Sequence, residues 1–178
     1  METLSTLSLA EQLAQALSQR GWMLATAESC TGGLIAAACT ELAGSSVWFE
    51  RGVVTYSNEA KTELIGVPAD LIARHGAVSE AVALAMAEGV LQRSRAQVAV
   101  AVTGIAGPSG GSVDKPVGTV WLAWAQQGRT PQAICQQFQG DRAAVREATV
   151  RCALQGVLDR LNDGFKDEAA SAVPAPRR

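Results

Sequence analysis

The chain has 178 residues, of which 48% are hydrophobic and 18% are charged, so it carries enough apolar side chains for one domain with a sizeable core. Its formal net charge of −2 argues against a broad nucleic-acid-binding surface, because such a surface needs many basic groups opposite the phosphates. The sequence shows neither a basic-then-apolar leader nor an apolar run approaching the roughly 20 residues of a membrane helix, so we expect no signal peptide and no membrane span.

Apolar residues at helical spacing alternate along the chain with short apolar runs that are typical of strands. In chain order, the sequence predicts helix 4–17, strand 22–27, helix 34–42, strand 47–56, helices 58–65, 68–73 and 81–92, strands 97–102, 117–125 and 130–138, and helix 143–161. Gly21 follows the first helix as a stop signal, and Ser79 and Asp141 precede two later helices as N-caps. A Gln-Gly-Arg turn joins the last two strands into a predicted hairpin.

This alternation of helices and strands predicts the α/β fold class. The hairpin implies a mixed sheet rather than a purely parallel one. The sequence contains no internal repeat and no domain boundary, so we expect residues 1–162 to form one domain. Residues 163–178 are polar and rich in proline and alanine, and we predict a disordered tail there.

The cysteines and the histidine do not have the spacing of a metal site. The four cysteines are Cys30, Cys39, Cys135 and Cys152, none of them in a C-x-x-C pair, and His75 is the only histidine. A structural zinc site usually needs four such ligands at close spacing, so we expect no metal. Without a secretory leader, free thiols indicate a reducing, cytoplasmic setting.

The segment 28–33, Glu-Ser-Cys-Thr-Gly-Gly, joins the first predicted strand to the second helix. Ser29 is expected at the strand end, where unpaired N–H groups of the helix start can hold a phosphate or a developing oxyanion. The plainer alternative is that Ser29 only caps the helix and the glycines let the turn close. The segment matches neither the Walker P-loop nor the G-x-G-x-x-G pattern.

A serine nucleophile needs a base, and two residue types can supply it. His75 is the only histidine candidate. A lysine can serve only where burial or nearby positive charge keeps it neutral. Of the three lysines, Lys61 follows the second strand at the start of a short helix, although a solvated helix lysine is the ordinary interpretation of any single lysine. Cys30 as the nucleophile is a further alternative.

Two further segments are suited to contacts with a ligand. The loop 103–111 follows a central strand and is rich in small residues, which let a ligand approach the backbone; the alternative is a plain solvent loop. Arg142 and Arg146 lie one helical turn apart on the last helix, and guanidinium groups suit phosphate. The alternative for either arginine is an ordinary surface position.

Five segments in a fixed order together resemble one family. They are Ala27-Glu28-Ser29-Cys30-Thr31-Gly32-Gly33, Tyr56-Ser57-Asn58-Glu59-Ala60-Lys61, Gly76-Ala77-Val78-Ser79, Thr103-Gly104-Ile105-Ala106-Gly107-Pro108 and Gly118-Thr119-Val120. They resemble the C-terminal domain of the competence/damage-inducible protein CinA, over roughly Leu9 to Leu161. The chain is similar to the free-standing form, whose members are nicotinamide-nucleotide amidohydrolases. The loop 107–111, Gly-Pro-Ser-Gly-Gly, is one local departure in a stretch that varies within the family.

The resemblance implies a three-layer α/β/α fold and hydrolysis of the carboxamide of nicotinamide mononucleotide to nicotinate mononucleotide and ammonia. It assigns Ser29 as nucleophile and Lys61 as base, with Tyr56 and Thr103 around the reacting group. The residues expected to bind the substrate are Cys30, Thr31, Gly32, Gly33, Asn58, Gly104, Gly107, Arg142 and Arg146. The expected partner is a small nucleotide, with no metal or organic cofactor, no nucleic acid and no membrane; the sequence leaves a homo-oligomer open.

Two rival classes fit the same residues. One is a non-catalytic nucleotide-binding or regulatory module with the same pocket and no turnover. The other is a different amidase or esterase that pairs Ser29 with His75.

Overall fold

The computed structural model describes residues 5–163 and contains every helix and strand that the sequence predicts, with small shifts at their ends. In chain order the elements are α1 (Thr6–Arg20), β1 (Leu24–Glu28), α2 (Leu34–Thr40), a 3₁₀ turn (Ser45–Val47), β2 (Phe49–Val54), α3 (Asn58–Ile65), α4 (Ala69–His75), α5 (Glu80–Gln92), β3 (Val98–Gly104), β4 (Thr119–Gln126), β5 (Gln132–Gln137) and α6 (Arg142–Asp163). Of the predicted tail 163–178, all but Asp163, the last residue of α6, lies outside the described residues.

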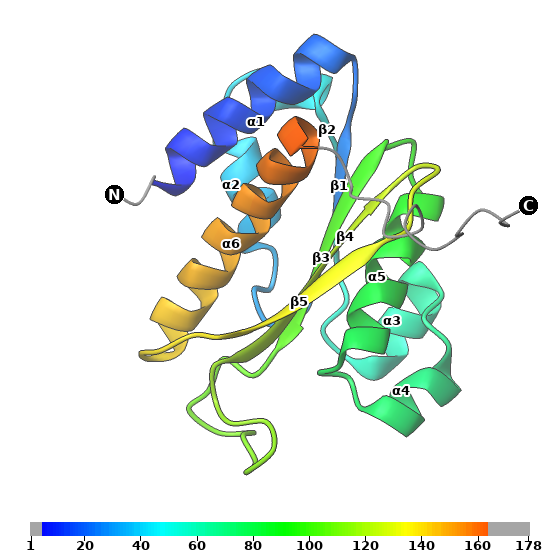
Figure 1. The fold of residues 1–178 in the computed structure, drawn as a ribbon, viewed down its shortest axis with the longest axis vertical. Helices are drawn as coiled ribbons and strands as arrows, with labels where there is room; N and C mark the ends of the chain where they lie inside the picture. Colours follow the sequence, from blue (N-terminus) through cyan, green and yellow to red (C-terminus); the bar gives the residue numbers. More distant parts are fainter. Residues whose placement is uncertain (1–4, 164–178) are drawn as a thin grey trace, which may run out of the picture.

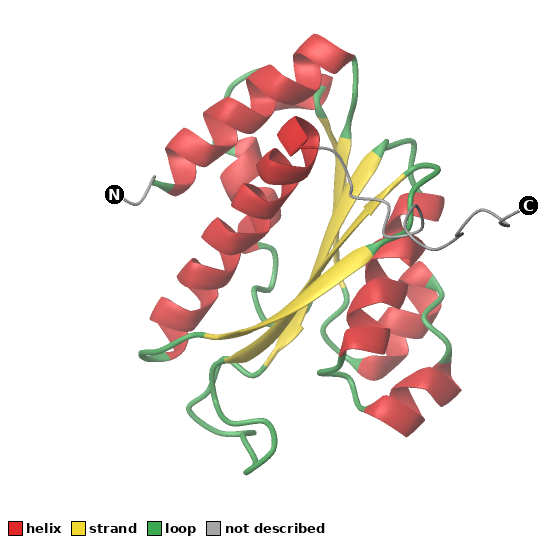
Figure 2. Cartoon of the chain, viewed as in Figure 1, coloured by secondary structure: helices red, strands yellow, loops and turns green. Residues whose placement is uncertain are grey.

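The five strands form one mixed sheet in the order β2-β1-β3-β4-β5, in which β1 is parallel to β2 and β3, and β4 is antiparallel to β3 and β5. Helices α1, α2 and α6 cover one face, and α3, α4 and α5 cover the other (Figures 1 and 2). The three-layer α/β/α architecture and the mixed sheet are thus confirmed. Within the described residues, no helix is both long and apolar enough to cross a membrane.

The two faces of the sheet carry side chains of different size, because successive residues of a strand point to opposite faces. Along β3, Val98, Val100 and Val102 pack on the α1, α2 and α6 side, whereas Ala99 and Ala101 pack on the α5 side. The same alternation places Glu28 with Leu24 on the face of α2. A strand-end carboxylate is thereby directed into the protein beside the start of α2.

Polar side chains begin two of the helices as predicted. The Ser79 hydroxyl accepts a hydrogen bond from the Val82 N–H at the start of α5, and the Asp141 carboxylate accepts one from the Ala144 N–H at the start of α6. Such caps contribute about 1 kcal/mol each. The predicted strand 47–56 begins only at Phe49, because the chain first completes the 3₁₀ turn after Gly44, which has a φ of 79°.

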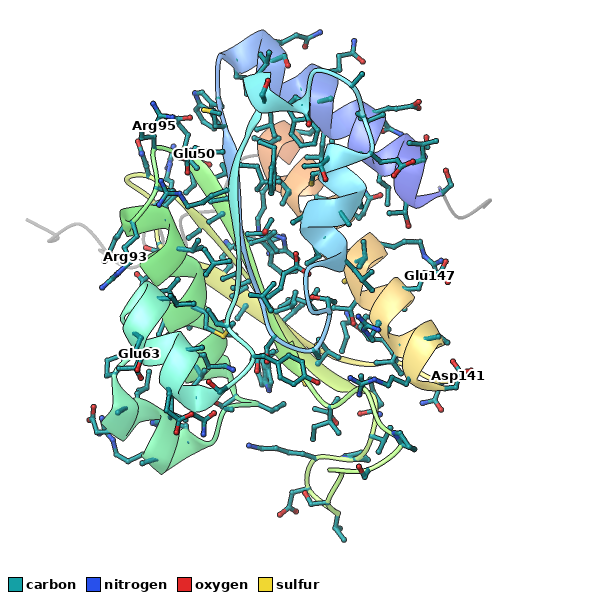
Figure 3. The ribbon with its side chains drawn as sticks, turned by 180° about the vertical axis from the view of Figure 1, so that it is seen from behind. Glu50, Glu63, Arg93, Arg95, Asp141 and Glu147 are labelled. Carbon is teal, nitrogen blue, oxygen red and sulfur yellow. The ribbon has the colours of Figure 1, made fainter. Side chains whose placement is uncertain are left out.

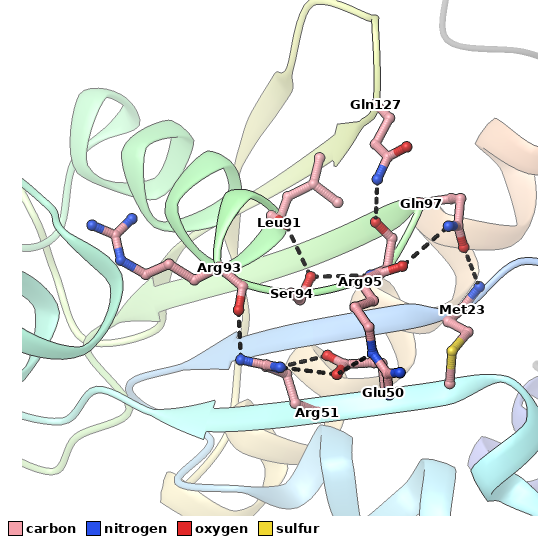
Figure 4. A network of polar contacts seen from close by, with 10 residues as sticks. Met23, Glu50, Arg51, Leu91, Arg93, Ser94, Arg95, Gln97 and Gln127 are labelled. Atoms are coloured by element: carbon pink, nitrogen blue, oxygen red, sulfur yellow. Dashed lines mark hydrogen bonds and ion pairs between the residues drawn. The ribbon is translucent and has the colours of Figure 1, made fainter.

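The topology brings the ends of several elements to one edge of the sheet. Strands β1, β2 and β3 are parallel, so their carboxyl ends share that edge, and β5 also ends there and leads into α6. Open α/β sheets bind ligands at this edge, at the point where the connections from two neighbouring strands run to opposite faces of the sheet. At the other edge, Gln97 binds the Met23 backbone, and Glu50 pairs with Arg51 and Arg95 (Figure 4). Figure 3 shows Glu50 and Arg95 far from Asp141, which marks the carboxyl edge.

Candidate active site

A pocket of about 230 Å³ lies at the carboxyl edge of the parallel strands. Its lining comes from the segments that follow β1, β2 and β3 and from the start of α6, and it consists of Ser29, Cys30, Tyr56, Asn58, Lys61, Ala77, Val78, Thr103, Gly104, Ala106 and Arg142. A larger hollow of about 410 Å³ lies between α3 and α4, but neither a serine nor a lysine lines it. The smaller pocket is therefore the one in which a serine hydroxyl and a lysine amine meet.

Ser29 is held at the end of β1 by its backbone. Its N–H donates to the Val102 carbonyl of β3 at 3.0 Å, and its carbonyl accepts from the Gly32 N–H at 3.0 Å. The N-cap of α2 is Gly33, with a φ of 104° and no side-chain cap. The Ser29 hydroxyl therefore does not cap the helix, and it is free to face Lys61.

The start of α2 is occupied by the side chain of Glu28. Its carboxylate accepts hydrogen bonds from the Thr31 hydroxyl at 2.6 Å and from the N–H groups of Gly33 at 3.0 Å, Ile35 at 3.0 Å and Ala36 at 2.8 Å. These donors are therefore already occupied and are not available to an anionic ligand. The N–H groups of Cys30 and Thr31 donate to no other residue in the part of the chain that the structure describes.

Lys61 is buried, with only 1% of its surface exposed. Its amine lies 3.2 Å from the Ser29 hydroxyl oxygen, 2.8 Å from the Thr55 carbonyl oxygen and 3.5 Å from the Ser57 carbonyl oxygen. Among the described residues it forms no ion pair with a carboxylate. Burial lowers the pKa of this amine below its ordinary value, because removing water penalises the charged form.

The two carbonyls give the amine a defined orientation. A neutral amine has two N–H donors and one lone pair. If the two N–H groups donate to the Thr55 and Ser57 carbonyls, the lone pair of the nitrogen faces the Ser29 hydroxyl. The amine can then accept the hydroxyl proton, and its separation from the oxygen is within the reach of a general base.

Tyr56, Thr103 and Arg142 complete the polar wall of the pocket. The Thr103 hydroxyl donates to the Ala77 carbonyl at 2.8 Å. The Arg142 guanidinium donates to the Tyr56 hydroxyl at 3.1 Å and to the Gly107 carbonyl at 2.9 Å. Tyr56 is 61% exposed, so it stands at the mouth and other groups bury Lys61. Because both acceptors of Arg142 are neutral, its charge is available to an anion.

Several predicted site residues lie outside this lining. The Arg146 guanidinium donates to the Thr31 carbonyl at 2.9 Å and lines a different hollow between α2 and α6. Thr31 is buried with its hydroxyl on Glu28, and Gly32, Gly33 and Gly107 are also absent from the lining. His75 is exposed at the end of α4 and is likewise absent from it.

Cys30 lines the pocket but is poorly suited to act as a nucleophile. Burial raises the pKa of its thiol to about 11, so the thiolate is scarce at neutral pH. Among the residues that the structure describes, no three His, Cys, Asp or Glu side chains are grouped so as to hold a metal ion.

The fold and this pocket define a class: an α/β domain that places a serine hydroxyl beside a buried lysine amine at the carboxyl edge of its parallel strands. Residues 6–161 match the sequence model of the CinA C-terminal domain, and the chain belongs to that family. The nicotinamide-nucleotide amidohydrolase PncC of Escherichia coli (strain K12) is 54% identical over 149 residues, which are 84% of this chain and 90% of that protein. PncC of Pseudomonas putida is 53% identical over 151 residues, which are 85% of this chain and 94% of that protein.

Solved structures of the family agree with this assignment. The crystal structure of a competence/damage-inducible protein from Agrobacterium tumefaciens is similar with a TM-score of 0.86 at 47% identity, and the match covers 90% of this chain and 99% of that one. A competence damage-inducible protein from Klebsiella pneumoniae gives the same TM-score of 0.86 at 43% identity. The family resemblance found in the sequence is confirmed.

Proposed function

We propose that the protein hydrolyses the carboxamide of nicotinamide mononucleotide, giving nicotinate mononucleotide and ammonia, with Ser29 as nucleophile and Lys61 as general base. The observation that carries this proposal is the contact of 3.2 Å between the Ser29 hydroxyl and a lysine amine that is only 1% exposed. The names of the relatives supply the substrate class.

In the first half of the reaction, Lys61 takes the Ser29 proton as the oxygen attacks the carboxamide carbon. The oxyanion that forms is stabilised by donors already in place, for which the Cys30 N–H is the candidate, because Cys30 lines the pocket and this N–H donates to no other described residue. The carbon–nitrogen bond then breaks, and the Lys61 ammonium returns the proton to the leaving nitrogen, which departs as ammonia. An ester between Ser29 and the nicotinate carbonyl remains.

Water completes the reaction by attacking this ester. Lys61 again accepts a proton, now from the water, and returns it to the Ser29 oxygen as nicotinate mononucleotide leaves. Each proton that Lys61 takes is given back, so the enzyme is regenerated.

The phosphate of the substrate is best assigned to Arg142. This arginine lines the pocket, and its hydrogen-bond partners among residues 5–163 are neutral, whereas Arg146 is directed to the Thr31 carbonyl. The start of α2 is not available to the phosphate, because its Gly33, Ile35 and Ala36 N–H groups already donate to the Glu28 carboxylate. Charge-assisted pairing with the Arg142 guanidinium is therefore the contact that we assign to the phosphate.

The rival classes make different predictions. A Ser-His hydrolase would need His75 in the pocket, and His75 is exposed elsewhere. A non-catalytic binding module would bind nicotinamide mononucleotide without changing it. The test is ammonia release from nicotinamide mononucleotide by the purified chain, together with binding measured by thermal shift. We expect turnover; binding without ammonia release would favour the regulatory module and refute the proposal.

A further inference from the structure

Glu28 is a buried carboxylate that the proposed reaction does not use directly. It is the last residue of β1, its surface is 1% exposed, and it immediately precedes Ser29. One carboxylate oxygen accepts from the Thr31 hydroxyl and from the Gly33 and Ile35 N–H groups, and the other accepts from the Ala36 N–H. Four accepted hydrogen bonds match the capacity of an ionised carboxylate.

These bonds replace the cap that α2 lacks. The helix has seven residues, and its N-cap residue, Gly33, provides no side-chain cap. The N–H groups of a first helical turn have no partner within the helix, and they carry the positive end of its dipole. Glu28 satisfies three of them with a negative charge, so the turn 29–33 is fixed between the strand and a helix that the same residue anchors.

The backbone of Glu28 also reaches the base. Its carbonyl accepts from the Thr55 N–H at 2.8 Å, and the Thr55 carbonyl in turn accepts from the Lys61 amine at 2.8 Å. Ser29 is bonded to Glu28 covalently. Glu28 therefore lies between the two segments that carry the nucleophile and the base.

We propose that Glu28 is a positioning residue that holds the Ser29 hydroxyl within 3.2 Å of the Lys61 amine and holds the turn so that the Cys30 N–H faces the pocket. This inference rests on the proposed function of Ser29 and Lys61. It predicts that weakening the Glu28 carboxylate slows the chemical step while leaving substrate binding, which involves other groups, nearly intact.

Two substitutions separate the charge of the Glu28 side chain from its length. Glu28→Gln keeps the shape of the side chain. Its amide NH2 group, however, replaces one of the two oxygens that accept backbone N–H groups, and an NH2 group cannot accept them. Glu28→Asp keeps the charge, but it retracts the carboxylate by roughly 1.5 Å, the length of one carbon–carbon bond, and so cannot reach all four donors. Glu41→Gln is the matched control, because it makes the same change at an exposed residue at the other end of α2.

The experiment measures kcat and KM for nicotinamide mononucleotide at a temperature where circular dichroism shows each variant to be folded. We expect kcat to fall about 100-fold in Glu28→Gln, as for a displacement of about 1 Å in an active site. We expect KM to change less than about threefold, because the lost interaction acts on the transition state. The Glu41→Gln control should match the wild type. A folded Glu28→Gln with the kcat of the control would overturn the proposal.

A second measurement does not depend on the substrate. Phenylmethanesulfonyl fluoride transfers its sulfonyl group to a reactive serine oxygen, which loses its proton, and fluoride leaves. Mass spectrometry of the intact protein then measures the fraction of the protein that carries the sulfonyl group. We expect slower labelling of Ser29 in Glu28→Gln than in the control. If the wild type is labelled at Ser29 but releases no ammonia, the proposed function fails, and this labelling ratio alone decides the role of Glu28. If the wild type neither turns over nor is labelled, both proposals fall. If neither Glu28 variant folds, Glu28 serves stability alone and the inference is overturned.

Discussion

Replacement of Lys61 by arginine separates a proton-accepting role from a purely electrostatic one. Arginine keeps the positive charge at this position but cannot give up its proton at any pH that the protein tolerates. The amine lies 3.2 Å from the Ser29 oxygen, so Lys61→Arg should lose the whole contribution of general-base catalysis. That contribution is typically about 10²- to 10⁴-fold in kcat, or about 3–5 kcal/mol of transition-state stabilisation. Ammonia release under saturating nicotinamide mononucleotide measures it.

The same lysine predicts how activity and stability depend on pH. Burial lowers the pKa of Lys61 from the ordinary 10.5, so kcat/KM should rise with pH as the amine becomes neutral. Between the lowered pKa and 10.5, the unfolded chain binds a proton that the folded protein does not, so the free energy of unfolding should rise with pH in that window. Urea unfolding at several pH values should show this rise for the wild type, with the Lys61 contribution absent from Lys61→Met.

Lys115→Arg is the control for Lys61→Arg in the ammonia-release assay, because it makes the same change at a lysine whose amine donates to the His75 carbonyl at the surface. The reasoning would be refuted if Lys61→Arg kept nearly normal activity while Lys61→Ala did not. Lys61 would then be a fixed positive charge, and another group would have to accept the Ser29 proton.

Three further predictions test separate parts of the account. Arg142→Ala should raise KM for nicotinamide mononucleotide about tenfold through loss of a charge-assisted contact, whereas Arg146→Ala should change KM much less; equal effects would contradict the assignment of the phosphate. Cys30 should resist alkylation at pH 7, because its thiol pKa is raised to about 11, and iodoacetamide treatment should leave turnover intact unless a thiol is the nucleophile. Asp141→Ala should lower the free energy of unfolding by about 1 kcal/mol, because the Ala144 N–H loses its cap; an unchanged melting temperature would show that water replaces it.

The sequence was sufficient to predict most of the fold. Periodic apolar residues placed each helix and strand, and the short hairpin before the last helix predicted the mixed sheet. Sequence patterning does not encode strand order, however, and the strand order places Ser29 beside Lys61 although they are 32 residues apart. The family resemblance, rather than periodicity, selected that pair.

Two features of the site depend on tertiary packing and could not be found from spacing. Arg142 and Arg146 are one turn apart, yet the rotation of α6 against the sheet directs only Arg142 to the pocket. In the sequence, Glu28 stood out only as a member of a motif. Its hydrogen bonds run to residues three to eight positions further along the chain, a spacing that matches neither the helical nor the strand period. A weak signal was present, since α2 starts after two glycines with no Ser, Thr, Asp or Asn at its first position.

The central claim is that Ser29 is the nucleophile, and its replacement by alanine tests this most directly. The measurement is ammonia release from nicotinamide mononucleotide by Ser29→Ala, beside Ser46→Ala, which removes the hydroxyl of an exposed serine on the 3₁₀ turn. Both variants should be folded, because the Ser29 hydroxyl does not cap α2. We predict turnover at the level of the buffer blank for Ser29→Ala and normal turnover for Ser46→Ala. Near-normal ammonia release by folded Ser29→Ala would contradict the account.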